Sequence, residues 1–404
     1  MNTIAVIGAG TMGAGIAQLV ATRGCKVHLI DVSEDVAQRG FEGIAKRLAR
    51  SVEKGKRTED ERTAIIDRIH IKTVIEDLAD VDLAVEAVVE DMGVKHKVFA
   101  ALENATPTSA ILATNTSSLP VSKIAEAVSD PSRVIGMHFF NPAPIMPLVE
   151  IIAGVRSAAS NIDAAYAAAQ AWGKIPVRAK DTPGFIVNRV ARGYYLEALR
   201  LLGEGVAGVD EIDGVMRTHG GFRMGPFELM DLVGLDVNFA VSTSVWQQFG
   251  KPPRLAPHEI QRTLVDQGYL GRKTGRGFFV YDGAAPLPAY PVDRKSFDLS
   301  PLLKDAMLAF CTNAGITDIN GTEQYILCRI LAAIMNEAGS ALSNGVASRN
   351  DIDIAMTKGT NYPKGPLAWS DEIGPRTVRG VLKTLNDSVD DDRYAASHYF
   401  AEAE

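Results

Sequence analysis

Cysteine and excess charge are both scarce in this chain. Three of its 404 residues are cysteines, at positions too far apart for a disulfide framework or a zinc-ligand pattern: Cys25, Cys311 and Cys328. We therefore expect reduced, buried thiols and no metal site. The 42 basic and 49 acidic side chains give a formal net charge of -7. This charge excludes a broad basic surface for nucleic acid or an anionic membrane.

Long hydrophobic runs are also missing from the sequence. No apolar run reaches the roughly 18 residues that span a bilayer. The opening stretch MNTIAVIGAG has neither the basic segment nor the small-residue cleavage site of a signal peptide. We therefore expect a cytoplasmic protein with no membrane partner. With 404 residues, of which 46% are apolar, the chain is long enough for two or three domains.

The first part of the chain alternates short, β-branched apolar runs with helix-like stretches. Continuous apolar strands separated by helices are typical of a mostly parallel sheet covered on both faces. This pattern predicts an α/β, doubly wound, Rossmann-type domain over residues 1–183. The strands are expected at Thr3–Ile7, Lys26–Ile30, Asp82–Ala87, Ala110–Thr114, Arg133–Phe139, Leu148–Ala153 and Lys174–Ala179.

The second part is helical and repeats itself. A shift of 140 residues, without gaps, matches 188–234 to 328–374 at 14 of 47 positions, including a Gly-Pro turn. We interpret the match as a duplicated helical module. The sequence thus predicts two related all-α domains, with the boundaries 184–282 for the first, 283–299 for a linker and 300–404 for the second.

A glycine-rich turn follows the first predicted strand. Gly8 permits a tight turn, Gly10 lets the backbone approach a pyrophosphate, and Gly13 lets helix and strand pack closely. Asp31, at the end of the second strand, can accept both ribose hydroxyls and would repel a 2′-phosphate, so NAD is favoured over NADP. The motif alone leaves FAD open. The residues expected at the cofactor are Gly8, Gly10, Thr11, Met12, Gly13 and Asp31.

A histidine and a glutamate flank a proline-rich loop in the stretch RVIGMHFFNPAPIMPLVEI at 133–151. Two strands joined by a short, stiff loop can bring His138 and Glu150 within hydrogen-bond reach. Hydride transfer from a carbinol needs a base for the hydroxyl proton, and the pKa of imidazole suits this task. The alternative is a core histidine beside an unrelated surface glutamate.

Hydroxyl side chains end another predicted strand, in ILATNTSSL at 111–119. The carboxyl ends of strands line the ligand crevice of an open α/β sheet, so Ser117 could bind a substrate oxygen. Alternatively, Ser117 or Ser118 caps a helix expected at Leu119–Val128.

Taken together, these motifs resemble those of the L-3-hydroxyacyl-CoA dehydrogenases. The resemblance covers about 1–282 in full. It is carried by GAGTMGAGIAQ at 8–18, VEAVVEDMGVK at 85–95, TNTSSL at 114–119, HFFNPAPIMPLVEI at 138–151, DTPGFIVNR at 181–189, MGPFELMDLVGLD at 224–236 and GRKTGRGFF at 271–279.

The resemblance implies NAD-dependent oxidation of a 3-hydroxyacyl-CoA, in fatty-acid β-oxidation or butanoyl-CoA metabolism. His138 would be the base and Glu150 its partner, while Ser117 would bind the 3-oxygen and Asn188 would orient the substrate. The family pattern adds four residues at the cofactor: Glu90, Lys95, Asn141 and Lys273.

The chain departs from the family at the CoA site. A serine of the family falls at Arg47 here, and the lysine that accompanies it falls at Lys54, which we expect to bind substrate. Two other readings remain open. One is a sugar-acid dehydrogenase of the L-gulonate type, and the other is a non-catalytic nucleotide-binding or structural protein.

The resemblance also implies a role for the helical domain, which in single-module members of the family is the dimerisation surface. The second copy has Cys328 where the first has Asn188. We therefore expect a non-catalytic second module that serves as an internal pseudo-dimer partner. A homodimer of the whole chain stays possible.

Overall fold

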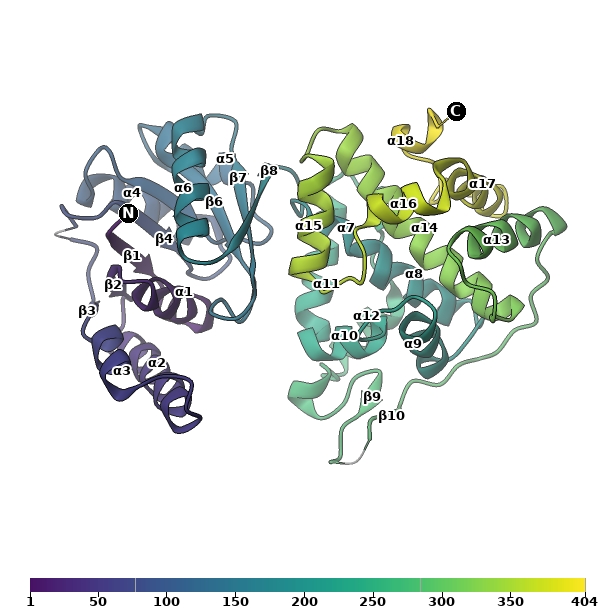
Figure 1. Ribbon diagram of the computed structural model, residues 1–404, viewed down its shortest axis with the longest axis horizontal. Helices are drawn as coiled ribbons and strands as arrows, with labels where there is room; N and C mark the ends of the chain where they lie inside the picture. Colours follow the sequence, from purple (N-terminus) through teal and green to yellow (C-terminus); the bar gives the residue numbers. More distant parts are fainter. Residues whose placement is uncertain (77, 284, 404) are drawn as a thin grey trace. The chain divides into compact units, whose positions relative to one another are not determined.

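The chain folds into two compact units, Met1–Phe185 and Ile186–Glu404 (Figure 1). The computed structural model describes residues 1–76, 78–283 and 285–403. Residues 284 and 404, which belong to the predicted linker and the last predicted domain, lie outside the described residues.

The first unit is built around one eight-stranded sheet. Its strand order is β3-β2-β1-β4-β5-β6-β7-β8, and every neighbouring pair is parallel except β6 and β7. The prediction of a mostly parallel, Rossmann-type sheet followed by a helical region is confirmed. The strands are β1 (Thr3–Ile7), β2 (Lys26–Ile30), β3 (Ile69–Lys72), β4 (Leu83–Glu86), β5 (Ile111–Thr114), β6 (Val134–Phe139), β7 (Leu148–Ala153) and β8 (Ile175–Lys180).

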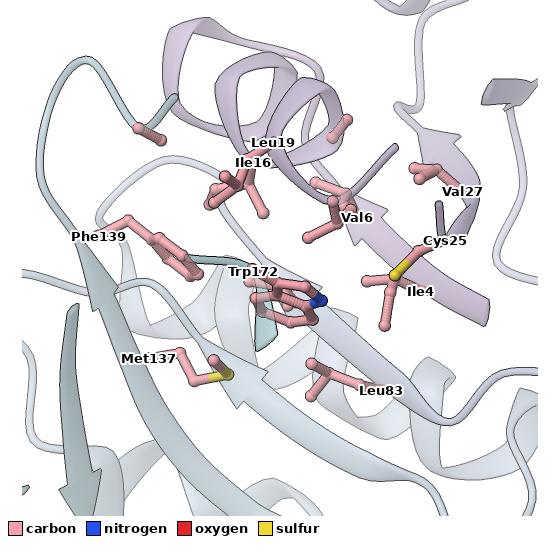
Figure 2. Packing of buried hydrophobic residues seen from close by; sticks show 14 of the residues in the cluster. Ile4, Val6, Ile16, Leu19, Cys25, Val27, Leu83, Met137, Phe139 and Trp172 are labelled. Carbon is pink, nitrogen blue, oxygen red and sulfur yellow. The ribbon is translucent and has the colours of Figure 1, made fainter. Parts of the chain in front are cut away.

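The strands are apolar because the sheet is covered by helices. In the close view of the core, Ile16 and Leu19 of the first helix point toward the sheet, and the Trp172 indole lies among the strand side chains (Figure 2). Burial on both faces explains why these strands are continuous apolar runs. The covering helices are α1 (Thr11–Thr22), α2 (Glu34–Glu53), α3 (Glu59–Ile66), α4 (Met92–Ala105), α5 (Val121–Ile124) and α6 (Ala159–Ala171).

The second unit is helical, apart from the short hairpin of β9 (Phe279–Val280) and β10 (Leu287–Pro288). The hairpin ends inside the segment predicted as a linker. The helices are α7 (Val187–Val190), α8 (Arg192–Gly203), α9 (Val209–Thr218), α10 (Pro226–Val233), α11 (Leu235–Gln248), α12 (Glu259–Asp266), α13 (Pro301–Asn313), α14 (Gly321–Ser343), α15 (Arg349–Gly359), α16 (Pro366–Ile373), α17 (Pro375–Asn386) and α18 (His398–Ala401).

Helix α14 is the one helix among the described residues that resembles a membrane span by length and composition. Its length and its mean hydropathy of 1.3 suffice for a membrane span, although Arg329 and Glu337 lie within it. However, 78% of its apolar window is buried inside the protein. The central helix of a folded domain meets the same criteria, so α14 is weak evidence for a membrane segment.

The sequence repeat has a counterpart in the positions of the helices. Helix α16 begins and ends 140 residues after α10, and α17 begins 140 residues after α11. Asp213 accepts hydrogen bonds from the first N–H groups of α10, and Asp353 does the same for α16. We call residues 188–248 and 328–388, which include α11 and α17, the first and second copies.

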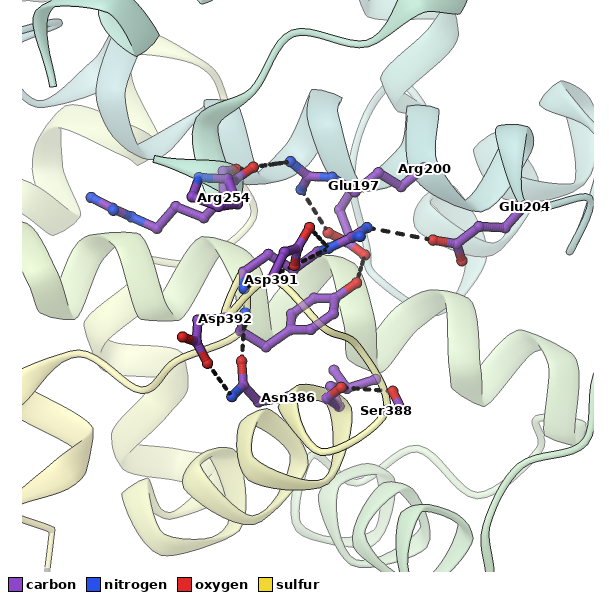
Figure 3. Close-up of polar contacts among 12 residues, drawn as sticks. Glu197, Arg200, Glu204, Arg254, Asn386, Ser388, Asp391 and Asp392 are labelled. Carbon is purple, nitrogen blue, oxygen red and sulfur yellow. Dashed lines mark hydrogen bonds and ion pairs between the residues drawn. The ribbon is translucent and has the colours of Figure 1, made fainter. Parts of the chain in front are cut away.

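The two copies meet through reciprocal ion pairs. Arg189 of the first copy donates to Glu337 of the second at 2.6 Å, and Arg329 of the second donates to Glu197 of the first at 2.7 Å. All four side chains are buried. Arg200 and Glu204 extend the network around Glu197 and Arg329 (Figure 3).

The backbones of the two copies approach closely at Gly193. A Cβ atom at this position would lie 2.8 Å from the backbone nitrogen of Ile334 and 2.9 Å from the carbonyl carbon of Ala333. Ala333 is the counterpart of Gly193 in the second copy. Helices α8 and α14 therefore pack with equivalent residues in contact, and only glycine fits at position 193 of α8.

Candidate active site

Two glycines of the turn after β1 are required by close backbone contacts. Gly8 has φ = 99°, and a Cβ atom there would lie 2.5 Å from the Ala87 carbonyl oxygen, just after β4. A Cβ atom at Gly13 would lie 1.8 Å from the Gly8 carbonyl oxygen. The turn therefore packs against β4 at the point where the strand order reverses, which is where open α/β sheets bind their ligands.

The space above this turn fits a dinucleotide. No described atom lies within 4 Å of a Cβ built on Gly10, the N-cap of α1, and the first turn of α1 has no acidic residue and no capping side chain. Its N–H groups are therefore available to a pyrophosphate. Asp31 Oδ2 accepts a hydrogen bond from the Ala9 N–H at 2.9 Å, which fixes the carboxylate beside the turn for a ribose.

The predicted pair His138 and Glu150 comes together in the antiparallel part of the sheet. The two residues lie directly opposite one another on β6 and β7, and Nδ1 of His138 is 2.7 Å from Oε2 of Glu150. Glu150 is 0% exposed and His138 is 6% exposed. The rings of Phe140 and Phe185 flank the imidazole, with centroids 4.5 and 5.9 Å away. Because a carboxylate only accepts, Nδ1 carries the proton and Nε2 has the lone pair.

Lys174 fastens the loop that joins these two strands, and sequence reasoning missed it. Its buried Nζ donates to the carbonyl oxygens of Ala143 and Met146 at 2.5 and 2.7 Å. Burial, followed by the nearby Arg23, lowers the pKa of Lys174 to about 8. The sequence had no signal for this role, because the contacts join residues about 30 positions apart.

Glu90 ties down the hydroxyl-rich loop after β5. Its Oε1 accepts from the Ser117 and Ser118 N–H groups at 3.0 Å each and from the Thr116 hydroxyl at 2.6 Å. Burial raises the pKa of Glu90, but Lys95 and the hydroxyls outweigh this effect, so the pKa lies below its ordinary value. Glu90 therefore remains a carboxylate that holds Ser117 at the sheet edge. His138 lies near the end of β6, the strand next to β5, at the same edge of the sheet.

Lys95 lies inside the unit rather than on its surface. It is 1% exposed, and its Nζ lies 2.6 Å from the fully buried Glu86 and 3.2 Å from Glu90. Glu86 also accepts from the Thr114 hydroxyl at 2.7 Å. Sequence analysis did not single out Glu86, because the residues around it predict only a buried strand. The direct contact of Lys95 with the cofactor stays a prediction.

The capping alternative for the serines is wrong. Pro120 is the N-cap of α5, and the carboxylate of Asp181 accepts from the Val121 and Ser122 N–H groups at 2.9 and 2.7 Å. The proline delays the helix, which is shorter than the expected Leu119–Val128. The stretch DTPGF that begins at Asp181 thus has a structural role in the first unit.

The remaining predicted residues are distributed over both units. Asn141 is exposed at the end of β6, and Lys54 is exposed at the C-cap of α2. Asn188 lies in α7 of the second unit, and Lys273, also in that unit, is 2.5 Å from a carboxylate oxygen of Asp236. On α2, Arg47 donates to the side chain of Gln18 at 2.6 Å. The ligand contacts of these residues stay predictions.

Comparison with known protein families identifies the chain. A model described as the NAD binding domain of 3-hydroxyacyl-CoA dehydrogenase matches residues 3–182, and a model of the C-terminal domain of that enzyme matches 184–281 and 325–403. The chain belongs to the 3-hydroxyacyl-CoA dehydrogenase family. It is an NAD-dependent oxidoreductase, and the matched NAD-binding domain contains the glycine turn described above.

Two members of the family align with almost the whole chain. It is 37% identical to the 3-hydroxyadipyl-CoA dehydrogenase of Escherichia coli, over 98% of this chain and 95% of the relative. It resembles a crystal structure of 3-hydroxybutyryl-CoA dehydrogenase from E. coli with a TM-score of 0.88 and 36% identity, over 99% and 98% of the two chains.

A shorter member aligns with part of the chain over almost its whole length. A probable 3-hydroxybutyryl-CoA dehydrogenase of Bacillus subtilis is 41% identical over 70% of this chain and 98% of its own length. The family therefore contains proteins without a counterpart for about 30% of this chain.

The glycine turn gives a matched pair of variants. Gly13→Ala should unfold or strongly destabilise the first unit, by about 1–3 kcal/mol or more, because its Cβ overlaps the Gly8 carbonyl. Gly10→Ala should fold normally, since its Cβ meets no protein atom, and should weaken NAD binding because it occupies the cofactor's space. Thermal melting and NAD titration distinguish the two effects. A Gly10→Ala variant with unchanged NAD affinity would contradict the assignment.

Lys174 should make stability depend on pH. Its pKa is about 8 in the folded chain and 10.5 ordinarily, so between these values the unfolded chain binds more protons. The free energy of unfolding should therefore rise from pH 8 to pH 10.5, and this contribution should vanish in Lys174→Met. Denaturant unfolding at several pH values measures it. The exposed Lys97→Met is the control and should keep the rise.

Proposed function

We propose that the chain catalyses the reversible oxidation of (S)-3-hydroxyacyl-CoA to 3-oxoacyl-CoA, with His138 as general base. The observation that carries this proposal is the buried 2.7 Å contact between His138 and Glu150 at the edge of the NAD-binding sheet. Bound NAD supplies the hydride acceptor. The relatives named above act on CoA thioesters by their names, which supports the same substrate class here.

His138 accepts the proton of the substrate hydroxyl at Nε2 in the oxidative direction. Glu150 holds the ring through Nδ1 and stabilises the imidazolium that forms, as the carboxylate does in other histidine-base sites. The flanking rings of Phe140 and Phe185 limit the access of water to the imidazole. In the reverse direction, the same imidazolium returns the proton to the substrate oxygen.

Ser117 and Asn188 position the substrate in this proposal. Ser117 binds the 3-oxygen, and Glu90 supports this role because it fixes the backbone of the serine loop. Asn188 orients the substrate from the start of the helical region. Lys54 and Arg47, which lie seven residues apart on one side of α2, bind the CoA phosphates. The reaction belongs to fatty-acid β-oxidation or butanoyl-CoA metabolism in the cytoplasm.

We further propose that the second helical copy replaces a partner subunit. In a twofold interface, residue i of one copy contacts residue j of the other, and j contacts i in return. The pairs Arg189–Glu337 and Glu197–Arg329 have this reciprocity, because Arg329 and Glu337 are the counterparts of Arg189 and Glu197. The contact at Gly193 lies between equivalent residues, as expected near a twofold axis.

Replacement of the base gives a direct test of the activity. His138→Gln should keep the fold and the affinity for NAD, and should lower kcat about 10²–10⁴-fold. Glu150→Gln should lower the rate through loss of imidazolium stabilisation and should shift the pH–rate profile. NADH formation from 3-hydroxybutyryl-CoA measures both variants, and free 3-hydroxybutyrate and L-gulonate serve as control substrates. Near-normal turnover in His138→Gln would refute the role of the base.

Removal of the second copy tests the internal pairing. The chain cut after Asp282 should form a homodimer, because Arg189 then pairs with Glu197 of a second molecule. The same truncated chain with Arg189→Glu should not dimerise, since two buried carboxylates would face one another. Light scattering coupled to gel filtration measures the masses. A truncated chain that is a stable, fully active monomer would overturn the pairing.

A further inference from the structure

A buried arginine in the first copy has no acidic partner. Arg192, at the start of α8, is 3% exposed. Its Nη1 donates to the Asn238 carbonyl oxygen at 3.2 Å and to the Ser242 hydroxyl at 2.7 Å, and its Nε donates to the Asn188 carbonyl oxygen at 2.9 Å. Within the described parts of the chain, no carboxylate lies within ion-pair distance of it. A buried cation with only neutral acceptors is costly unless something else balances it.

The second copy shows that the fold does not need this arginine. The counterparts of Arg192, Asn238 and Ser242 are Ala332, Val378 and Leu382, all fully buried. The same pair of helices therefore packs well with apolar side chains alone. The polar cluster around Arg192 is therefore not required for this packing.

Arg192 also differs from the arginines that join the copies. Arg189 and Arg329 are equivalent, and both have buried carboxylate partners. In contrast, Arg192 is present only in the copy that has Asn188, whose counterpart is Cys328. Arg192 thus occurs in the same copy as Asn188, the proposed substrate-orienting residue, whereas the arginines of the Arg–Glu pairs occur in both copies.

The surroundings of the guanidinium are polar but uncharged. Its Cζ lies 5.0 Å from the centroid of the Tyr195 ring. Tyr362 of the second copy has a buried hydroxyl without a hydrogen-bond partner among the described residues. Burial lowers the pKa of Arg192, and Tyr195 and Tyr362 only partly oppose this effect. Because guanidinium stays protonated at neutral pH, the cluster is suited to an anion.

We propose that Arg192 binds the distal carboxylate of a dicarboxylic 3-hydroxyacyl-CoA, and so sets the substrate class. This inference rests on the proposed function, in which Asn188 orients the substrate. The Nε of Arg192 lies 2.9 Å from the carbonyl oxygen of Asn188, so the guanidinium is beside the residue that orients the substrate. In a six-carbon diacid, the far carboxyl carbon lies three bonds, about 4 Å, beyond C3, which suits a cation close to the residue that orients the substrate.

A matched pair of substrates tests this assignment. (S)-3-hydroxyadipyl-CoA and (S)-3-hydroxyhexanoyl-CoA have chains of equal length and differ in a terminal carboxylate or methyl group. The native chain should favour the diacid at least tenfold in kcat/KM. Arg192→Met should bring this ratio close to one, mainly through a higher KM for the diacid, and Arg192→Lys should restore part of the preference.

A second variant guards against a folding defect. The triple variant R192A/N238V/S242L gives the first copy the residues that the second copy uses at the same positions. It should fold with a melting temperature near that of the native chain and should also lose the preference for the diacid.

The outcomes separate the inference from the proposed function. If the native chain oxidises both substrates equally well, Arg192 does not select a carboxylate, although the dehydrogenase activity stands. If the Arg192 variants lose both substrates to the same extent, the arginine only supports Asn188, and the inference is refuted. If the native chain oxidises neither substrate, the proposed function fails and the inference falls with it.

Discussion

The candidate active site depends on one reversal of strand direction. All strands from β3 to β6 run parallel, and β7 turns back along β6. Residues directly opposite in an antiparallel pair have Cβ atoms about 4.5–5.5 Å apart, which a histidine and a glutamate can bridge. A shift of the register by one residue would place Val149 or Ile151 opposite His138 and turn the carboxylate to the other face. The tight loop and its lysine anchor therefore fix the chemistry as well as the fold.

Buried charge is handled differently at different places in the molecule. Glu86 with Lys95, and Arg189 with Glu337, are charges whose partners are built into the chain. Removal of one partner from such a pair typically costs about 3–5 kcal/mol, because the other charge stays buried. These pairs therefore specify which segments meet. Arg192 stands apart, because its neighbours satisfy its hydrogen bonds but not its charge.

The sequence predicted what is repeated or periodic, and missed what depends on distant contacts. Seven strands were predictable because each is a continuous apolar run, whereas β3 is short and partly exposed and has no such signal. The glycine turn and the His138–Glu150 pair were predictable because their members lie close in the sequence. Lys174 was not, since its acceptors belong to a loop elsewhere in the chain. The repeat predicted which residues are equivalent, but not that Arg189 pairs with Glu337.

The crossing of α8 and α14 at Gly193 has a consequence for how the two copies have diverged. Partners on separate molecules are encoded by one gene, so every substitution alters both sides of their contact. Two copies on one chain mutate independently. Because they are covalently joined, their association does not depend on the protein concentration. The two copies can therefore differ in their interiors, with Asn188 and Arg192 in the first and Cys328 and Ala332 in the second, while they share the Arg–Glu pairs. The arrangement also changes the ratio of helical copies to active sites. In the proposed arrangement, two helical copies serve a single dinucleotide site.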